Sequence, residues 1–126
     1  MKVIIADDSR LIRGIIEKTA ASIGFEAVQA GNGEEAIHLL EAEGSTIDLV
    51  LLDWNMPLLN GIDVIKKMRS DDRFKKIPVL MISTESEEDR IQEAINAGAQ
   101  GYLTKPFTAD TLLDSIRQVV AGRQAL

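Results

Sequence analysis

Short apolar runs alternate along the chain with longer stretches in which apolar residues recur every three or four positions. The runs predict five strands, at residues 2–6, 26–30, 47–52, 77–82 and 101–103. The first and third runs are almost continuously apolar, which is typical of strands covered on both faces of a parallel sheet. We therefore expect a parallel sheet whose central strands are buried.

The stretches that follow the runs have the spacing of amphipathic helices. A polar residue that can cap a helix N-terminus precedes each of them, namely Ser9, Asn32, Asn60, Ser86 and Thr108. Gly24 and Gly98 follow the first and fourth stretches, where glycine commonly ends a helix. Strand and helix thus alternate throughout, which predicts an α/β fold with helices on both faces of the sheet and right-handed crossovers.

Length and charge limit the possible classes of function. The 126 residues fit one domain, which we expect to span residues 1–126. The net charge, 14 − 20 = −6, argues against nucleic acid or an anionic membrane surface as the direct partner. No apolar stretch approaches the roughly 20 residues of a transmembrane helix, and the N-terminal run is too short for a signal peptide. Cysteine is absent, so thiol chemistry is excluded. We expect a soluble, cytoplasmic protein.

Candidate chemistry lies at the carboxyl ends of the predicted strands. In open α/β sheets, ligands bind outside these ends. Two carboxylates follow the first run, one follows the third, hydroxyls follow the fourth, and an ammonium group follows the fifth. These residues are Asp7, Asp8, Asp53, Ser83, Thr84 and Lys105. The sequence therefore predicts one polar site built from four strand ends.

Three carboxylates at one edge of a sheet repel each other. At ~4 Å each pair costs about 4 kcal/mol at an effective dielectric constant of 20, so cations must compensate. Lys105 supplies one cation. The remaining ligand atoms are all oxygen, which indicates a hard metal ion such as Mg²⁺. The alternative is that Asp7 and Asp8 only cap the following helix, and Asp53 and Lys105 at the neighbouring strand ends argue against it.

Taken together, these residues resemble a known family. The pair Asp7-Asp8, the segment 53–57 (DWNMP), Ser83 and Lys105-Pro106 are similar to the receiver domains of two-component response regulators. Segment 53–57, Gly101-Tyr102 and segment 105–108 (KPFT) resemble chemotaxis receivers in particular. The resemblance covers essentially the whole chain. It implies a flavodoxin-like (βα)₅ fold with the strand order 2-1-3-4-5, which is the order of the receiver fold itself.

The resemblance also implies a reaction. Asp53 would accept a phosphoryl group from the phosphohistidine of a histidine kinase, with Mg²⁺ as cofactor. Asp8, Asp53 and the backbone carbonyl of Asn55 would bind the metal directly, and Asp7 would bind it through water.

Other residues would hold the phosphoryl group. The Ser83 hydroxyl and the Lys105 ammonium group would contact its oxygens, which is reasonable because phosphoryl transfer depends mainly on positioning and charge neutralisation. By the same resemblance, the peptide bond between Lys105 and Pro106 is expected to be cis.

A signalling switch needs an element with two states. In the family, the hydroxyl residue moves toward the phosphoryl group and an aromatic residue on the fifth strand turns inward; here these are Ser83 and Tyr102. Thr84 competes with Ser83 for this role, and Tyr102 has the alternative of a half-buried aromatic at the sheet edge. Asn55 and Glu85 are expected to tune the access of water.

We therefore expect a phosphoacceptor switch that is not an enzyme acting on external substrates. Its output face would be the fourth helix, fifth strand and fifth helix, and its target a protein, with the flagellar motor switch as the chemotaxis candidate. Nothing demands a dimer. A receiver excised from a larger regulator and a phosphorelay intermediate are the alternatives.

Two rival classes fit less well. A Mg²⁺-dependent phosphohydrolase of the haloacid dehalogenase type needs an aspartate as general acid two residues after the nucleophile, where this chain has Asn55. A flavodoxin-like cofactor binder would have its flavin phosphate repelled by the acidic edge.

Two other features are interpreted as solvated surface. His38 lies in a helical stretch far from the acidic edge. A basic cluster near the end of the third helix favours a solvated face that complements the helix dipole over a docking patch, and it comprises Lys66, Lys67, Arg69, Arg73, Lys75 and Lys76.

Overall fold

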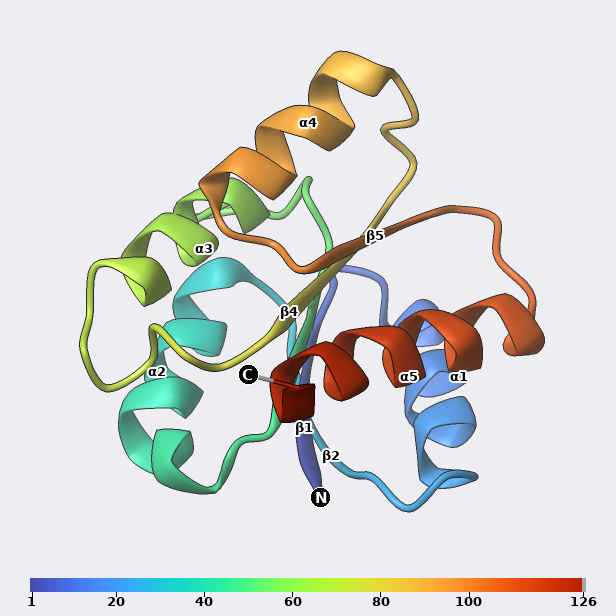
Figure 1. The fold of residues 1–126 in the computed structure, drawn as a ribbon, viewed down its shortest axis with the longest axis horizontal. Coiled ribbons are helices and arrows are strands. Elements are labelled where there is room, and N and C mark those ends of the chain that lie inside the picture. Colours follow the sequence, from blue (N-terminus) through green and yellow to red (C-terminus); the bar gives the residue numbers. More distant parts are fainter. Residues whose placement is uncertain (126) are drawn as a thin grey trace.

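A computed structural model describes residues 1–125, with side chains as far as Gly122. Its strands form one parallel sheet in the order β2-β1-β3-β4-β5 (Figure 1). Their bounds are β1 Lys2–Ala6, β2 Glu26–Ala30, β3 Leu49–Leu52, β4 Val79–Ser83 and β5 Gly101–Thr104. The predicted fold class and strand order are confirmed.

The helices cover both faces of the sheet. They are α1 Arg10–Ala21, α2 Gly33–Glu43, α3 Gly61–Arg69, α4 Glu88–Ala97 and α5 Ala109–Ala125, with a short 3₁₀ helix, η1, at Gly44–Thr46. Figure 1 shows α1 and α5 on one side and α2, α3 and α4 on the other. Alternate residues of the central strands enter two separate apolar cores, one on each side. None of the described helices is long and apolar enough to cross a membrane.

Four of the five predicted helix caps are confirmed. The side-chain oxygens of Ser9, Asn32, Asn60 and Thr108 each accept a hydrogen bond from the backbone N–H three residues later, at 2.9 to 3.2 Å. Each bond satisfies one of the N–H groups that a helix leaves unpaired in its first turn. Local sequence therefore fixes where these helices begin.

The predicted cap of the fourth helix was wrong by one residue. The N-cap of α4 is Glu87, not Ser86, the helix begins at Glu88, and Glu87 makes no side-chain capping bond. The segment before it is held by tertiary contacts instead: the backbone N–H of Glu85 bonds to Ser83, and the backbone carbonyl of Glu85 accepts a bond from Tyr102. These contacts pull the chain away from helical geometry until residue 88.

Strand boundaries also shifted slightly. β3 and β4 each begin two residues later than predicted, and β5 ends one residue later, at Thr104. Pro78 explains the start of β4, because proline has no N–H to donate to a sheet. Its carbonyl still accepts a bond from the N–H of Val50 at 3.0 Å.

Most of the predicted solvated positions are exposed, with one exception. His38 and five of the six residues of the basic cluster are exposed, as expected. Arg69 is instead half-buried, and its guanidinium group donates hydrogen bonds to backbone carbonyls, including those of Ile77 (2.8 Å) and Gly98 (2.9 and 3.0 Å). Burial lowers its pKa. Its partners are 5 to 31 residues away in sequence and most are backbone carbonyls, so the run of basic residues gave no sign of them.

Two glycines allow the loop after β3 to pack closely against the rest of the protein. A Cβ atom on Gly61 would overlap the carbonyl oxygen of Asp53, and one on Gly33 would overlap that of Leu59. The N–H of Gly61 also donates to the carbonyl of Trp54 at 2.9 Å. Backbone therefore meets backbone at both places, and this fixes the segment that follows Asp53.

We predict that Gly61→Ala lowers the free energy of unfolding by more than about 2 kcal/mol, because the overlapping atom is backbone and cannot turn aside. Gly14→Ala is the matched control: nothing lies within 4 Å of the added methyl group, and alanine in a helix is favoured by about 1 kcal/mol. Urea unfolding measures both. Equal effects of the two substitutions would contradict the close approach at Gly61.

Candidate functional site

The register of the sheet brings two carboxylates together. Ala6 pairs with Leu52, so the next residues, Asp7 and Asp53, leave neighbouring strands at the same level. The N–H of Asp53 donates to the carbonyl of Ala6 at 2.9 Å. One carboxylate oxygen from each of Asp7, Asp8 and Asp53 lies within 4.8 Å of the others. The three side chains therefore converge at one point of the sheet edge, as predicted.

The three carboxylates differ in burial. Asp7 is 2% exposed and Asp53 is 7% exposed, whereas Asp8 is exposed to solvent. Asp7 accepts a bond from the N–H of Ser9 at 2.8 Å. The site thus has two buried carboxylates and a third at its mouth.

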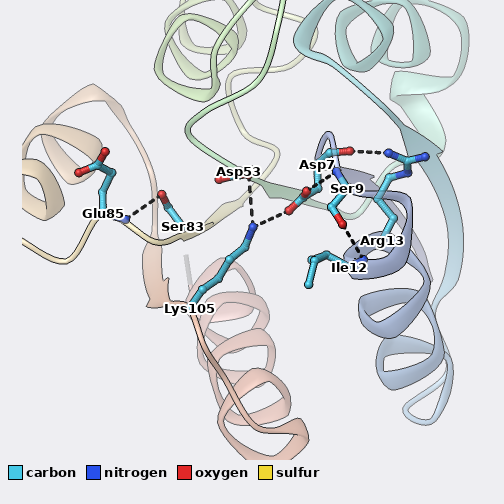
Figure 2. Close-up of polar contacts among 8 residues, drawn as sticks. All are labelled: Asp7, Ser9, Ile12, Arg13, Asp53, Ser83, Glu85 and Lys105. Atoms are coloured by element: carbon cyan, nitrogen blue, oxygen red, sulfur yellow. Dashed lines mark hydrogen bonds and ion pairs between the residues drawn. The ribbon is translucent and has the colours of Figure 1, made fainter.

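Lys105 lies between the two buried carboxylates (Figure 2). Its Nζ is 2.7 Å from Asp7 Oδ2 and 3.3 Å from Asp53 Oδ2. Its backbone N–H donates to the carbonyl of Ser83 at 2.8 Å, and the Lys105–Pro106 peptide bond is cis, as the resemblance implied. Burial alone would lower the pKa of Lys105, but the bonds and charges of Asp7 and Asp53 outweigh it and raise this pKa.

Asp53 remains incompletely compensated. Burial raises its pKa, the charge of Asp7 adds to this, and the attraction of Lys105 and the N–H of Trp54 oppose it without cancelling it. A single ammonium group therefore does not neutralise the carboxylates. The remaining excess of negative charge favours binding of a further cation.

The donor set fits a hard divalent cation. The candidate ligands are carboxylate oxygens, and Asp8 at the mouth leaves one ligand open to solvent. Mg²⁺ prefers such a site, with one or two carboxylates and retained waters. Asn55, whose carbonyl was predicted to join them, is exposed in the loop two residues after Asp53.

Ser83 and Tyr102 are linked through Glu85. The Ser83 Oγ accepts a bond from the N–H of Glu85 at 3.2 Å (Figure 2), and the Tyr102 hydroxyl donates to the carbonyl of Glu85 at 2.6 Å. Ser83 is fully buried and Thr84 is exposed, which favours Ser83 over its rival. Tyr102 is half-buried, and burial raises its pKa.

Sequence reasoning missed two arginines near the site. Arg13 of α1 donates to the backbone carbonyl of Asp7 at 2.6 Å and to the side chain of Gln29 at 2.9 Å, and so ties the loop after β1 to β2. Arg90 of α4 lies over the ring of Trp54. In the sequence both are simply polar residues of amphipathic helices. Their partners lie on other elements, so only the fold reveals them.

Comparison with known proteins agrees with this geometry. The profile of the response regulator receiver domain matches residues 3–117. The chain belongs to this family. As a receiver domain it is a component of two-component signalling, and it is similar to chemotaxis protein CheY1 of Helicobacter pylori (43% identity over 97% of this chain and 98% of the relative). Chemotaxis protein CheY of Pseudomonas aeruginosa is 39% identical over 94% and 95%.

Solved receiver structures have the same fold. Chemotaxis protein CheY4 of Vibrio cholerae superposes with a TM-score of 0.84 at 36% identity, covering 94% of this chain and 97% of that one. The receiver domain of the Francisella response regulator 1452 has a TM-score of 0.87 at 30% identity, covering 96% and 97%. The chain is thus similar to CheY proteins in both sequence and fold.

We predict that Asp53→Asn stabilises the metal-free receiver domain at pH 7. A carboxyl whose pKa is higher in the folded than in the unfolded chain holds its proton more tightly when folded, so the folded state loses stability as the pH rises from the ordinary value of 3.8 through the folded one. The amide of the variant does not ionise, so the variant avoids this loss of stability. Urea unfolding in EDTA measures the difference in the free energy of unfolding between the variant and wild type.

The gain should shrink as the pH falls below 3.8, where the wild-type carboxyl is protonated in both states. Asp72→Asn is the control, because the side chain of Asp72 is 94% exposed. A variant no more stable than wild type at pH 7 would show that Lys105 fully compensates Asp53.

Proposed function

We propose that this protein is a phosphorylation-operated switch in which Asp53 accepts a phosphoryl group from the phosphohistidine of a histidine kinase. One observation supports this most strongly: a nearly buried ammonium group, on Lys105, contacts two buried carboxylates at the edge of the sheet where α/β proteins bind ligands. A purely structural ion pair would need only one of these carboxylates. Asp7 is the closer partner of Lys105, so Asp53 is the carboxylate that is available to react.

The reaction is a transfer between two side chains. A carboxylate oxygen of Asp53 forms a bond to phosphorus while the phosphorus–nitrogen bond of phosphohistidine breaks, and the leaving imidazole nitrogen keeps the electron pair and takes a proton from solvent. The Lys105 ammonium and the Ser83 hydroxyl hold the phosphoryl oxygens. Neutralising and positioning these oxygens is most of what such a reaction requires.

A metal ion would complete the charge balance. Asp8, Asp53 and the carbonyl of Asn55 would hold Mg²⁺ directly and Asp7 would hold it through water, which fits the exposed position of Asp8 and the hydrogen-bonded burial of Asp7. When bound, Mg²⁺ supplies positive charge to the phosphoryl oxygens.

The switch consists of Ser83 and Tyr102. In the unphosphorylated protein both hydroxyls bond to the backbone of Glu85. When Ser83 turns toward a phosphoryl group, it releases the N–H of Glu85, and Tyr102 gains room to turn inward. Asn55 and Glu85, on the two loops beside Asp53, set how readily water attacks the acyl phosphate.

The pathway is of the chemotaxis type, by similarity to the CheY proteins. The output face is α4, β5 and α5, the target is a protein such as the flagellar motor switch, and the receiver, a single domain over residues 1–126, acts as a monomer without direct contact to nucleic acid. A phosphorelay intermediate is the second candidate. Turnover of external phosphate esters is disfavoured, because Asn55 stands where a general acid is needed and an amide cannot donate the proton.

The cytoplasmic location of the protein stays a prediction.

Phosphorylation tests the acceptor. Acetyl phosphate with Mg²⁺ should add the mass of one phosphoryl group to the intact protein, and hydroxylamine should remove it, because an acyl phosphate reacts with that nucleophile. Asp53→Asn should abolish the adduct, and Asp72→Asn should leave it unchanged. Full labelling of Asp53→Asn would disprove the assignment.

Fluorescence tests the metal site. Trp54 is the only tryptophan and directly follows Asp53, so its emission should change when Mg²⁺ binds. Asp8→Ala should weaken Mg²⁺ binding by about tenfold or more, because it removes one of the few charged ligands. Glu87→Ala, an exposed acid beyond the site, is the control. Equal Mg²⁺ affinity in Asp8→Ala and wild type would exclude Asp8 as a ligand.

A further inference from the structure

Apolar packing holds α4 only weakly. Ala94 is its only buried residue. Ile95 is 39% exposed, and the N-cap Glu87 makes no side-chain capping bond. A helix with so little apolar burial depends on its polar contacts for its position.

The C-terminal end of α4 is fixed by Arg69 of α3. The guanidinium group donates two hydrogen bonds to the carbonyl of Gly98, the C-cap residue, at 2.9 and 3.0 Å. It also bonds to the side chain of Gln100 at 2.9 Å. A Cβ atom on Gly98 would come within 2.7 Å of the Arg69 side chain, so the two fit closely. This end of the helix is anchored to α3 and to the start of β5.

The N-terminal end is held by a different arginine. The Arg90 guanidinium carbon lies 5.6 Å from the centre of the Trp54 ring, within the range of a cation–π contact. Trp54 is 7% exposed and follows Asp53 directly in the chain. Burial raises the pKa of Tyr102 and the charge of Arg90 opposes that rise, which places Arg90 in electrostatic reach of the switch tyrosine as well. The first turn of α4 is thus tied to the loop that carries the acceptor.

We propose that the contact between Arg90 and Trp54 restrains α4 in its unphosphorylated position and so opposes the switch; the inference rests on the function proposed above. Ser83 and Tyr102 hold Glu85, three residues before α4 begins, in the arrangement seen here. When Ser83 releases Glu85, the first turn of α4 moves with the loop and Arg90 leaves the ring. The contact belongs to the unphosphorylated state, so its loss favours the other state.

Binding of beryllofluoride with Mg²⁺ tests this in the full chain, because beryllofluoride mimics a phosphoryl group on a carboxylate. Arg90→Gln should bind it about two- to fivefold more tightly than wild type, which is the size of an exposed cation–π contact. Isothermal titration calorimetry measures the affinity without relying on Trp54. Arg90 is exposed, so the variant retains the fold.

Two controls separate the ring contact from other effects. Arg90 also forms an ion pair with Glu93 at 3.4 Å, so Glu93→Gln should leave beryllofluoride affinity unchanged. Arg73 makes a cation–π contact of the same kind, with its guanidinium carbon 4.6 Å from the centre of the Phe74 ring, in the segment that follows the C-terminal end of α3. Arg73→Gln should also leave beryllofluoride affinity unchanged. A second readout is hydrogen exchange of the amides at 87–91, which should quicken in unliganded Arg90→Gln.

If Arg90 instead attracted the anion bound at Asp53 directly, Arg90→Gln would weaken beryllofluoride binding. The two explanations therefore predict opposite changes in affinity. Equal or weaker binding by Arg90→Gln, with wild type binding normally, overturns the restraint and leaves the proposed function intact. Tighter binding in Glu93→Gln as well would assign the effect to the ion pair and also overturn it. Failure of wild type to bind beryllofluoride overturns both.

Discussion

The ammonium group of Lys105 between Asp7 and Asp53 is the interaction on which the rest of the structure depends. Two carboxylates cannot stay ionised in a buried position without compensation, and removing one member of a buried charged set leaves the others unpaired. The compensating cation comes from the far end of the chain. Strands β1, β3 and β5 must therefore be complete and in register before the site exists, and the site in turn ties the last strand to the first.

The same interaction leaves the two buried carboxylates unequally compensated. Lys105 lies closer to Asp7 than to Asp53, 2.7 Å against 3.3 Å, and burial still raises the pKa of Asp53. Asp53 is thus the less satisfied of the two carboxylates. A cation that binds beside Asp53 would compensate this carboxylate and so lower the free energy of the folded state. Gly33 and Gly61 keep the adjoining loop packed in place beside it.

Much of this was predictable from sequence because it depends on local rules. The apolar runs located the strands, and the rule for strand ends then placed Asp7, Asp53 and Lys105 together. Four helix caps followed from single polar residues such as Ser9, whose partner lies three residues away. The choice between Ser83 and Thr84 needed the burial of each side chain, which depends on which face of β4 meets the core.

The remainder depends on contacts that no local pattern encodes. Arg69 looked like one more basic residue of a solvated helix end, because most of its partners are backbone carbonyls, which every residue has. The start of α4 moved because Tyr102 holds Glu85, and a tertiary bond overrode a suitable N-cap. The contact between Arg90 and Trp54 joins a helix to a loop from another part of the chain.

Because α4 is anchored at its C-terminal end, a small tilt of the helix moves its N-terminal end the furthest. The helix has 10 residues and is therefore about 15 Å long. With Gly98 fixed to Arg69, the helix is a lever, and a tilt of only about 10° carries its first turn through roughly 2.6 Å, by the same rise per residue. In the proposed switch, a short movement of the Ser83 hydroxyl would therefore displace the charged side chains at the start of α4 far enough for another protein to distinguish the two positions.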